Sequence, residues 1–347
     1  MSVTIKDVAK LAGVSASTVT RTCQNHPAIS AETKKKVREA MSALGYVSSY
    51  TQREDTPEQN PDRPRSIAVA LPPFTSRDIY ENSFFLEAIG GISQACAQSQ
   101  CTISLAIGST EEELIKNARL LIDSKRADGF VVLYSKDHDT LIDYLHSNHI
   151  FYVLIGKVSV YPNDTVYVDN DNLMAAREAT DYLLELGHRR IAFLSGESTY
   201  LFNQDRHAGY IQSLLLHQIE FRPEYSFSME TVLDRDAAKT FHSILTGDEA
   251  PTAILVSDDM MVIKLIKLLG QWGIRVPEQL SVITFNNSFV AVNSVPPLTA
   301  VDINPCQLGM EAARQLFLHL DTPKKLATKI IVPHRLIHRE SCGAPDR

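Results

Sequence analysis

From residue 66 onward, short apolar segments rich in β-forming residues alternate with segments of helical periodicity. The first apolar segments are SIAVALP at 66–72, CTISLAIG at 101–108, DGFVVLYS at 128–135 and FYVLIGK at 151–157. The helix-like segments between them cover residues 84–99, 111–124 and 141–148. Strands that alternate with helices in this way form a parallel sheet covered by helices. The alternation therefore predicts an α/β fold.

The same pattern then starts again and builds a second unit of comparable length. Its apolar segments are TVYVDN at 165–170, RIAFLSG at 190–196, TAILVSDD at 252–259 and SVITFNN at 281–287. We expect its helices at residues 172–186, 206–218 and 260–272. Two such units predict two doubly wound parallel sheets in separate lobes. Because ligands bind at the carboxyl ends of parallel strands, a cleft between the lobes is the expected binding site.

The first 47 residues have the pattern of a small all-helical module. Thr4 caps a first helix with apolar residues at helical spacing, and Gly13 ends it. Ser15 caps a second helix that runs to about Gln24, and Ser30 caps a third helix. Two short helices joined by a tight turn and followed by a third are typical of a helix-turn-helix. The expected outer face of the second helix carries Ala16, Ser17, Thr20 and Arg21, while Val19 faces inward.

The distribution of charge favours DNA as the partner of this module, although the whole chain has a formal net charge of −7. Up to residue 40, three acids (Asp7, Glu32 and Glu39) stand against the basic residues Lys6, Lys10, Arg21, Lys34, Lys35, Lys36 and Arg38. A basic module on an acidic chain is typical of a DNA-binding head. A thin outer face on the second helix would enter a major groove and let Arg21 reach a guanine edge. A helical hairpin with no DNA partner has the same spacing, but it does not account for the KKK run.

The chain resembles the LacI/GalR family of bacterial transcription regulators over nearly its whole length. The head sequence TIKDVAKLAGVSASTVTR is highly specific for that family, and later segments follow in the family's order: NSFF, VDNDN, LGHRRIAFLSG, RHAGY, PTAILVSDD, SVITFNN and PPLTAVDINPCQLGMEAA. The combination of LYS, IGK, VDNDN and FNNS is most similar to the maltose-operon repressors of Gram-positive bacteria. The resemblance implies a periplasmic-binding-protein-like bilobed core with three strand crossovers, and a homodimer that binds double-stranded operator DNA. The chain ends in ESCGAPDR without a heptad tail, so a dimer is expected rather than a tetramer.

The resemblance also implies domain boundaries. The head covers residues 1–47 and a linker or hinge covers 48–65. The first lobe takes residues 66–166 and about 302–326, and the second lobe takes 167–301 and about 327–343.

The same resemblance assigns DNA-contacting residues. It implies that Ala16, Ser17 and Arg21 face the bases, with Arg21 the main candidate for direct readout. The set expected to contact phosphates or position the head is Thr4, Ser15, Thr18, Asn25, His26, Ser30 and Thr33.

The linker departs from the family. Members carry an Ala-Arg/Gln-x-Leu hinge helix whose leucine enters the minor groove, but SSYTQREDTPEQNPDRPR at 48–65 has no such leucine. Its prolines and acids oppose a helix and oppose contact with phosphate. Either the hinge is rebuilt around residues 47–53 or the ligand is coupled to DNA binding differently, and the sequence leaves both open.

Polar and aromatic residues at the expected strand ends form the candidate effector site. A sugar needs paired hydrogen-bond donors and acceptors for its hydroxyls and an aromatic face for its apolar surface. The candidates are Phe84 (with Phe289 as an alternative), Tyr134, Arg206, Asp258, Asn286 and Asn287. Relatives often have Asp where Asn286 stands. Asp258 or Asp259 has an alternative role as a helix cap, Asn286 and Asn287 as turn residues, and Tyr134 as wall packing.

The sequence favours a sugar-responsive repressor over other classes of protein. The five cysteines form no CxxC pair, the N-terminus has no signal-peptide pattern, and no apolar run is long enough to cross a membrane. A cytoplasmic regulator is therefore expected, rather than a transport binding protein with the same bilobed core. The absence of a P-loop, a nucleophile elbow and metal-ligand spacing argues against an enzyme and against a metal or other cofactor. Maltose or a related α-glucoside is the expected effector, and the alternative is a regulator whose DNA binding is tightened by a corepressor or a protein partner.

Overall fold

The computed structural model describes residues 4–23, 29–44, 64–73, 82–229, 232, 235–322 and 326–346. The chain divides into two compact units, residues 1–64 and 65–347.

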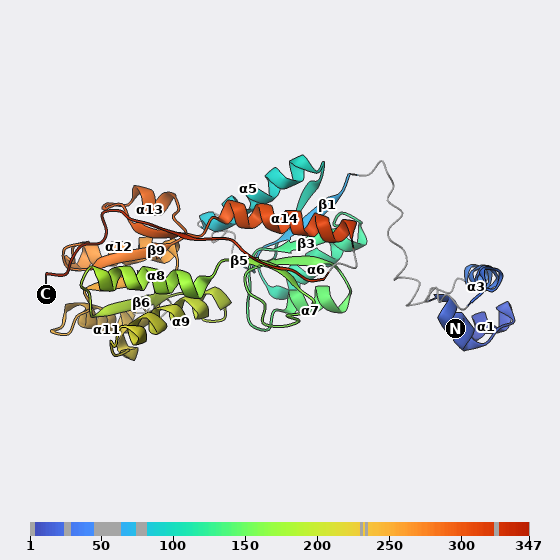
Figure 1. Ribbon diagram of the computed structural model, residues 1–347, viewed down its shortest axis with the longest axis horizontal. Coiled ribbons are helices and arrows are strands. Elements are labelled where there is room, and N and C mark those ends of the chain that lie inside the picture. Colours follow the sequence, from blue (N-terminus) through green and yellow to red (C-terminus); the bar gives the residue numbers. More distant parts are fainter. Residues whose placement is uncertain are drawn as a thin grey trace. The chain divides into compact units, whose positions relative to one another are not determined.

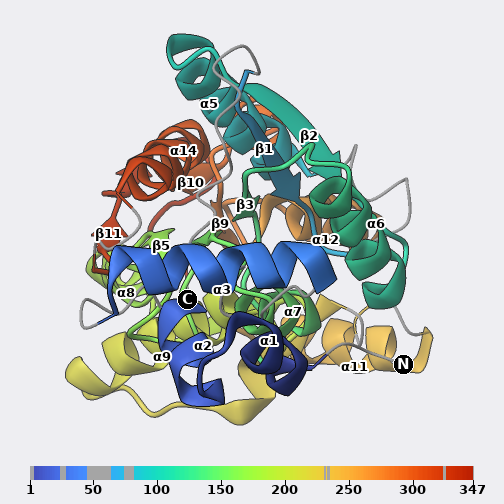
Figure 2. The same cartoon turned by 90° about the vertical axis from the view of Figure 1, so that its right-hand side faces the viewer.

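The described part of the N-terminal unit holds three helices around a small core of its own. Its helices are α1 (Ile5–Ala12), α2 (Ala16–Cys23) and α3 (Ala31–Leu44). Figure 2 shows α3 lying across α1 and α2, with which it is in contact. The buried side chains of the head are Val8, Ala9, Val19, Val37, Ala40 and Met41.

The helix ends of the head are set by local side chains, as the sequence predicts. The carboxylate of Asp7 accepts hydrogen bonds from the backbone N–H and the hydroxyl of Thr4 (2.8 and 2.7 Å). Gly13 follows α1 at a φ of 65°, in the left-handed region that glycine adopts without a Cβ clash. The hydroxyls of Ser15 and Ser30 accept from backbone N–H groups three residues later (3.1 and 3.2 Å).

In the described part of residues 65–347, two six-stranded sheets carry helices on both faces (Figure 1). The first sheet has the order β11-β5-β4-β3-β1-β2 and is parallel throughout. Helices α5 and α14 cover one face of it, and α6 and α7 cover the other. The elements of this first lobe are β1 (Ser66–Ala70), α5 (Ser83–Gln98), β2 (Thr102–Ala106), α6 (Glu111–Asp123), β3 (Gly129–Val132), α7 (Thr140–Ser147), β4 (Tyr152–Ile155), β5 (Val166–Asp169), α14 (Pro305–Asp321) and β11 (Lys329–Ile331).

The second lobe repeats this layered design. Its sheet has the order β12-β10-β9-β8-β6-β7, in which only β12 is antiparallel. Helices α8 and α9 cover one face, and α11, α12 and α13 cover the other. Its elements are α8 (Asn172–Glu185), β6 (Ile191–Ser195), α9 (Leu201–Leu216), the 3₁₀ turn η2 (Pro223–Tyr225), β7 (Ser226–Ser228), α11 (Arg235–Thr246), β8 (Ala253–Val256), α12 (Asp259–Trp272), β9 (Ser281–Phe285), α13 (Phe289–Asn293), β10 (Thr299–Asp302) and β12 (Arg335–Ile337).

The structure places two strands in a different lobe from the one that the sequence boundaries predict. We expected the second lobe to begin at residue 167, but all of β5 pairs with β4 in the first sheet. We also expected residues 327–343 in the second lobe, but β11 pairs in parallel with β5. The chain therefore crosses between the lobes after β5, after β10 and after β11, which gives the three expected crossovers.

Candidate functional site

The outer face of α2 is small and polar, and the serine that caps this helix organises its start. The Ser15 hydroxyl lies 2.8 Å from the hydroxyls of both Ser17 and Thr18, and it accepts the Thr18 N–H. Ser17 and Arg21 are exposed, as the sequence predicts. The Thr20 hydroxyl is turned back on the helix, where it donates to the Ala16 carbonyl (3.1 Å). Ser17 and Arg21 are thus the polar side chains of this face that are exposed to solvent.

Ala16 lies deeper than expected. We placed it on the outer face, but it is half-buried and packs against the core of the head. Its position one residue into α2, beside the turn at Val14, brings its methyl group against that core.

The other candidate DNA contacts of the head fall into two groups. Thr4, Ser30 and Thr33 lie at helix starts, and the hydroxyls of Ser30 and Thr33 are 2.9 Å apart. Asn25 and His26 lie outside the described residues. On α3, Lys36 forms an exposed ion pair with Glu32 (3.0 Å).

A cavity of about 220 Å³ lies between the two lobes of the core. Five of the six predicted effector residues line it: Phe84, Tyr134, Arg206, Asp258 and Asn286. Asn287 does not, which corrects the prediction for that residue. The Asn287 amide donates to Asp302 (3.1 Å) and its side-chain oxygen accepts from Arg339, so it ties its turn to neighbouring segments. Phe289, the alternative aromatic residue, is 78% exposed and does not line the cavity either.

Arg206 is the buried cation of the cavity, with only 3% of its surface exposed. Its Nε donates to the Asn172 side-chain oxygen (2.9 Å) and its Nη1 donates to the Ser257 carbonyl. The guanidinium also lies over the rings of Phe285 and Phe202, 3.9 and 4.8 Å from their centroids. These contacts fix the guanidinium in one orientation.

Asp258 and Asn286 form a second polar pair in the cavity, at the ends of neighbouring strands. The Asn286 amide donates to Asp258 Oδ2 (3.1 Å), and both residues are buried. Asn286 has a φ of 85°, which asparagine tolerates better than most residues. Asn286 is therefore both a turn residue and a cavity residue.

The two aromatic candidates contribute differently to the wall. Phe84, on the first turn of α5, packs against the cores of both lobes and stacks edge-on with Phe85 (5.5 Å). The Tyr134 hydroxyl donates to the Asp139 carboxylate. Burial raises the pKa of Tyr134, and it also raises the pKa of Asp139. The Tyr134 hydroxyl is thus engaged inside the wall.

The prediction missed several polar and aromatic residues that line the cavity: Asn82, Ser135, Asp169, Asn170, Asn172, Tyr200 and Phe202. Burial raises the pKa of Asp169 to about 7, although the Asn170 N–H (2.8 Å) and Arg206 favour its charged form. The signal for Asp169 and its neighbours was the VDNDN motif, which stands at the carboxyl end of β5.

The side chain of Asn170 joins all three crossover segments. Its amide donates to the carbonyls of Ile303 (3.0 Å) and Val332 (2.8 Å), which directly follow β10 and β11. The Asn304 amide donates to the Pro333 carbonyl (2.8 Å) and adds a second link between two of the segments. The three crossover segments are therefore joined at one small hydrogen-bonded junction.

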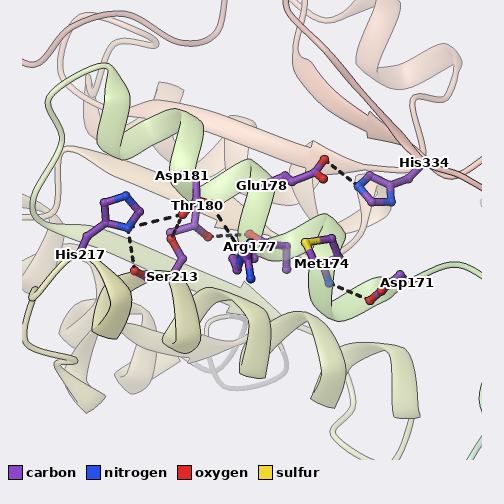
Figure 3. Close-up of polar contacts among 10 residues, drawn as sticks. Asp171, Met174, Arg177, Glu178, Thr180, Asp181, Ser213, His217 and His334 are labelled. Carbon is purple, nitrogen blue, oxygen red and sulfur yellow. Dashed lines mark hydrogen bonds and ion pairs between the residues drawn. The ribbon is translucent and has the colours of Figure 1, made fainter.

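The segment after β11 is also attached to α8. Figure 3 shows His334 beside Glu178, with Nε2 and Oε2 2.9 Å apart, and Asp171 accepting the Met174 N–H (2.9 Å) at the start of α8. Further along α8, Asp181 accepts a hydrogen bond from Ser213 of α9.

A second set of contacts, the interlobe clasp, joins the loop at 135–137 and Lys157 of the first lobe to residues 197–205 of the second lobe. Its backbone part consists of the Asp137 N–H donating to the Thr199 carbonyl (3.0 Å) and the Leu201 N–H donating to the Ser135 carbonyl (3.1 Å). Its ion pairs are Lys157 with Asp205 (2.9 Å) and Lys136 with Glu197 (3.5 Å). The lobes are therefore in direct contact beside the cavity.

Two further features are absent from the described part of the chain. None of its helices is both long and apolar enough to span a membrane. Within the same residues, no cluster of three or more His, Cys, Asp or Glu side chains is arranged to hold a metal ion.

Comparison with known families matches both parts of the molecule. The family described as "Bacterial regulatory proteins, lacI family" matches residues 4–49. The "Periplasmic binding protein-like domain" matches residues 180–342.

Individual proteins match over the whole chain or the whole core. The HTH-type transcriptional regulator MalR of Streptococcus pneumoniae serotype 4 is 32% identical over 352 residues, covering 98% of this chain and all of that protein. A crystal structure of a LacI transcriptional regulator from Bacillus cereus subsp. cytotoxis is 33% identical, covers 81% of this chain and 99% of its own, and has a TM-score of 0.75. The complex of the transcriptional regulator CelR with cellobiose is 25% identical, covers 98% of this chain and all of its own, and has a TM-score of 0.72.

Proposed function

The chain belongs to the LacI family of bacterial regulatory proteins, and from this premise we propose that a sugar bound in its interlobe cavity releases it from operator DNA. It is a DNA-binding transcriptional repressor of the sugar-operon type. The proposal adds the inducer, which is maltose or a related α-glucoside, and the residues that bind it.

The observation that carries this proposal is the composition of the cavity wall. Buried charged and amide groups lie beside aromatic rings from both lobes: Arg206, Asp258, Asn286, Phe84 and Phe202. Fixed donors and acceptors suit the adjacent hydroxyls of a sugar, and the rings suit its apolar faces. The MalR name of the 32% identical relative and the motifs shared with maltose-operon repressors support an α-glucoside.

The ligand acts through the relative positions of the lobes. A sugar that contacts both walls binds best to one arrangement of the lobes, and it shifts the population toward that arrangement. The Asn170 junction permits the lobes to change their angle, and the clasp beside the cavity is the contact that such a change breaks or makes. The first lobe carries the linker to the DNA-binding head, so a change in its position is transmitted to that head.

A panel of mono- and disaccharides in a thermal-shift assay, followed by operator binding with the sugar that stabilises the chain, tests this proposal. We expect maltose or a related α-glucoside to raise the melting temperature and to weaken operator binding. Tighter operator binding in the presence of the sugar would instead indicate a corepressor. No stabilisation by any sugar would refute a carbohydrate ligand.

Replacing Arg21 by alanine is expected to cost about 1–3 kcal/mol of discrimination between the operator and mismatched sites. Arg21 is exposed on α2, and an arginine that reaches guanine O6 and N7 carries sequence selection. The measurement is the selection of duplexes from a randomised pool at fixed salt.

The control for this change is Arg38→Ala, which removes an exposed arginine from α3 of the same head. If Arg38 contacts phosphate, the change is expected to lower the affinity for all DNA sequences by a similar factor and to leave the selected sequence unchanged. An Arg21→Ala head that selects the wild-type sequence with wild-type stringency would contradict the assignment.

We further propose that the chain is a homodimer that uses an apolar surface on the second lobe. Phe289 and Val292 on α13, Val295 after it and Ile263 on the adjoining α12 are all exposed, and Val295 is 90% exposed. Exposed apolar patches of this kind mark interaction sites, and a twofold dimer lets one patch bury its own copy.

Replacing Phe289 by aspartate is expected to give a folded monomer by light scattering. Phe289 is exposed, so the core does not lose a side chain, whereas a charge in an apolar interface opposes association. Leu120→Asp, at an exposed leucine on α6, is the control and is expected to stay dimeric. If the Phe289→Asp chain is dimeric at the concentration at which the wild-type chain is dimeric, this surface is not the dimer interface.

A further inference from the structure

Two cysteines stand at the end of α5, where the helix turns back into β2. Gln100 has a φ of 50°, in the left-handed region, and the Cys101 N–H donates to the Cys96 carbonyl (2.9 Å). A left-handed residue after the helix, with this six-residue hydrogen bond, defines a Schellman end. In that motif the side chains of the two hydrogen-bonded residues commonly touch, and here both are cysteines.

The two side chains are in contact. Cys96 is buried in the core of the first lobe, and Cys101 packs against the same core but is partly exposed. A hydrogen bond between the two thiols raises the pKa of Cys96 and lowers the pKa of Cys101. The nearby Arg65 lowers the pKa of Cys101 further, while burial and Asp128 oppose this effect.

The backbone geometry permits a bond between them. With 2.9 Å between the Cys101 nitrogen and the Cys96 oxygen, standard bond lengths place the two Cα atoms at most about 6.8 Å apart. Disulfides join Cα atoms that are about 4.4–6.8 Å apart. The two Cα atoms are therefore no farther apart than a disulfide can span.

We propose that Cys96 and Cys101 form a reversible disulfide in response to a peroxide. The Cys101 thiolate attacks one peroxide oxygen, so that an S–O bond forms, the O–O bond breaks and the other oxygen leaves as water after taking up a proton. The Cys96 sulfur then attacks the sulfenic acid at Cys101, the S–S bond forms and a second water leaves. Two thiols and one hydrogen peroxide thus give one disulfide and two waters, and a dithiol reductant reverses the change.

The cysteine pair lies next to the residues that connect the linker to the first strand of the core, so a disulfide there would affect that connection. Cys101 precedes Thr102, whose N–H and hydroxyl both donate to the Arg65 carbonyl (2.8 and 3.3 Å), and Arg65 is the residue before β1. Arg65 also pairs with Asp321 at the end of α14 (2.6 Å). The disulfide stiffens the turn that contacts the first core residues after the linker. This inference stands independently of the sugar and of the operator.

The test uses the full chain, which is first reduced and then freed of reductant. The chain is next treated with hydrogen peroxide, alkylated and digested with trypsin. Cys96 and Cys101 share one tryptic peptide. We expect that peptide to be lighter by two hydrogen atoms and unalkylated, and to be alkylated twice after dithiothreitol. Peptides with Cys306 and Cys342 are expected to stay alkylated. Two alkyl groups on the shared peptide, at peroxide concentrations that begin to oxidise the other cysteines, would overturn the proposal.

Single serine variants separate the two roles. In Cys96→Ser, Cys101 has no partner, and we expect dimedone to trap its sulfenic acid at several times the wild-type yield. In Cys101→Ser, Cys96 is buried and is expected to stay a thiol. Cys306→Ser, on the neighbouring α14, is the control and is expected to form the disulfide as the wild-type chain does. A dimedone adduct on wild-type Cys101 as abundant as in Cys96→Ser would show that the bond does not close.

Discussion

Replacing Gly91 by alanine is expected to lower the free energy of unfolding by about 3 kcal/mol. Gly91 lies where α5 meets α14, and an added Cβ would stand 1.9 Å from the Cys306 carbonyl oxygen and 2.9 Å from the Met310 nitrogen. Both are backbone atoms, so the clash is relieved only by moving one helix away from the other. Gly309 makes the reciprocal close approach from α14, where a Cβ would be 2.0 Å from the Ala88 oxygen. Urea unfolding followed by circular dichroism measures the loss.

Gly90 supplies a matched control one residue away. A Cβ at Gly90 meets nothing within 4 Å, so Gly90→Ala gains helix propensity without a clash. We expect it to be stabilising by about 1 kcal/mol. Equal stability of the Gly90→Ala and Gly91→Ala chains would show that the helices are not held this closely in solution.

Replacing Arg206 by alanine is expected to weaken sugar binding by at least about 100-fold. The change removes the buried guanidinium that lies in the cavity and leaves the Asn172 oxygen and the Ser257 carbonyl without this donor. It also takes away the cation that lies against Phe202 and Phe285. Operator binding without sugar is expected to persist, and release by sugar is expected to be lost. Calorimetric titration with the sugar found in the thermal-shift panel gives the affinity.

Two further variants separate binding from folding. Arg206→Lys keeps the positive charge but cannot form the two hydrogen bonds of a planar guanidinium, so it is expected to bind sugar weakly. Its melting temperature is expected to lie closer to that of the wild-type chain. Arg189→Ala removes an arginine that is exposed on the same lobe and is expected to bind normally. A folded Arg206→Ala chain that binds sugar with wild-type affinity would remove Arg206 from the site.

Local sequence signals predicted the helix ends of the head and five of the residues that line the cavity. The carboxylate of Asp7 and the hydroxyls of Ser15 and Ser30 accept hydrogen bonds from backbone N–H groups within three residues, so these caps are visible in the sequence. Strand ends with polar residues, such as Asp258 and Asn286, meet at one edge of a parallel sheet and were predicted for that reason.

Features that depend on distant pairing were not predictable in this way. An apolar pattern shows that residues 166–169 form a strand, but it does not show which sheet the strand joins, so β5 and β11 were placed in the wrong lobe. Asn287 was included because it follows Asn286, yet a turn sends the two neighbouring side chains to different partners. Asn170 stood in a recognised motif, but its hydrogen bonds go to carbonyls more than a hundred residues away.

The junction at Asn170 determines how motion spreads through the core. Three chain segments pass between the lobes, and hydrogen bonds from Asn170 and Asn304 join them, so a rotation about this junction would preserve these bonds whereas a separation of the lobes would break them. In a rigid rotation, displacement grows in proportion to distance from the axis. In a rotation about this junction, atoms next to Asn170 would shift least, and atoms at the far end of the first lobe would shift most.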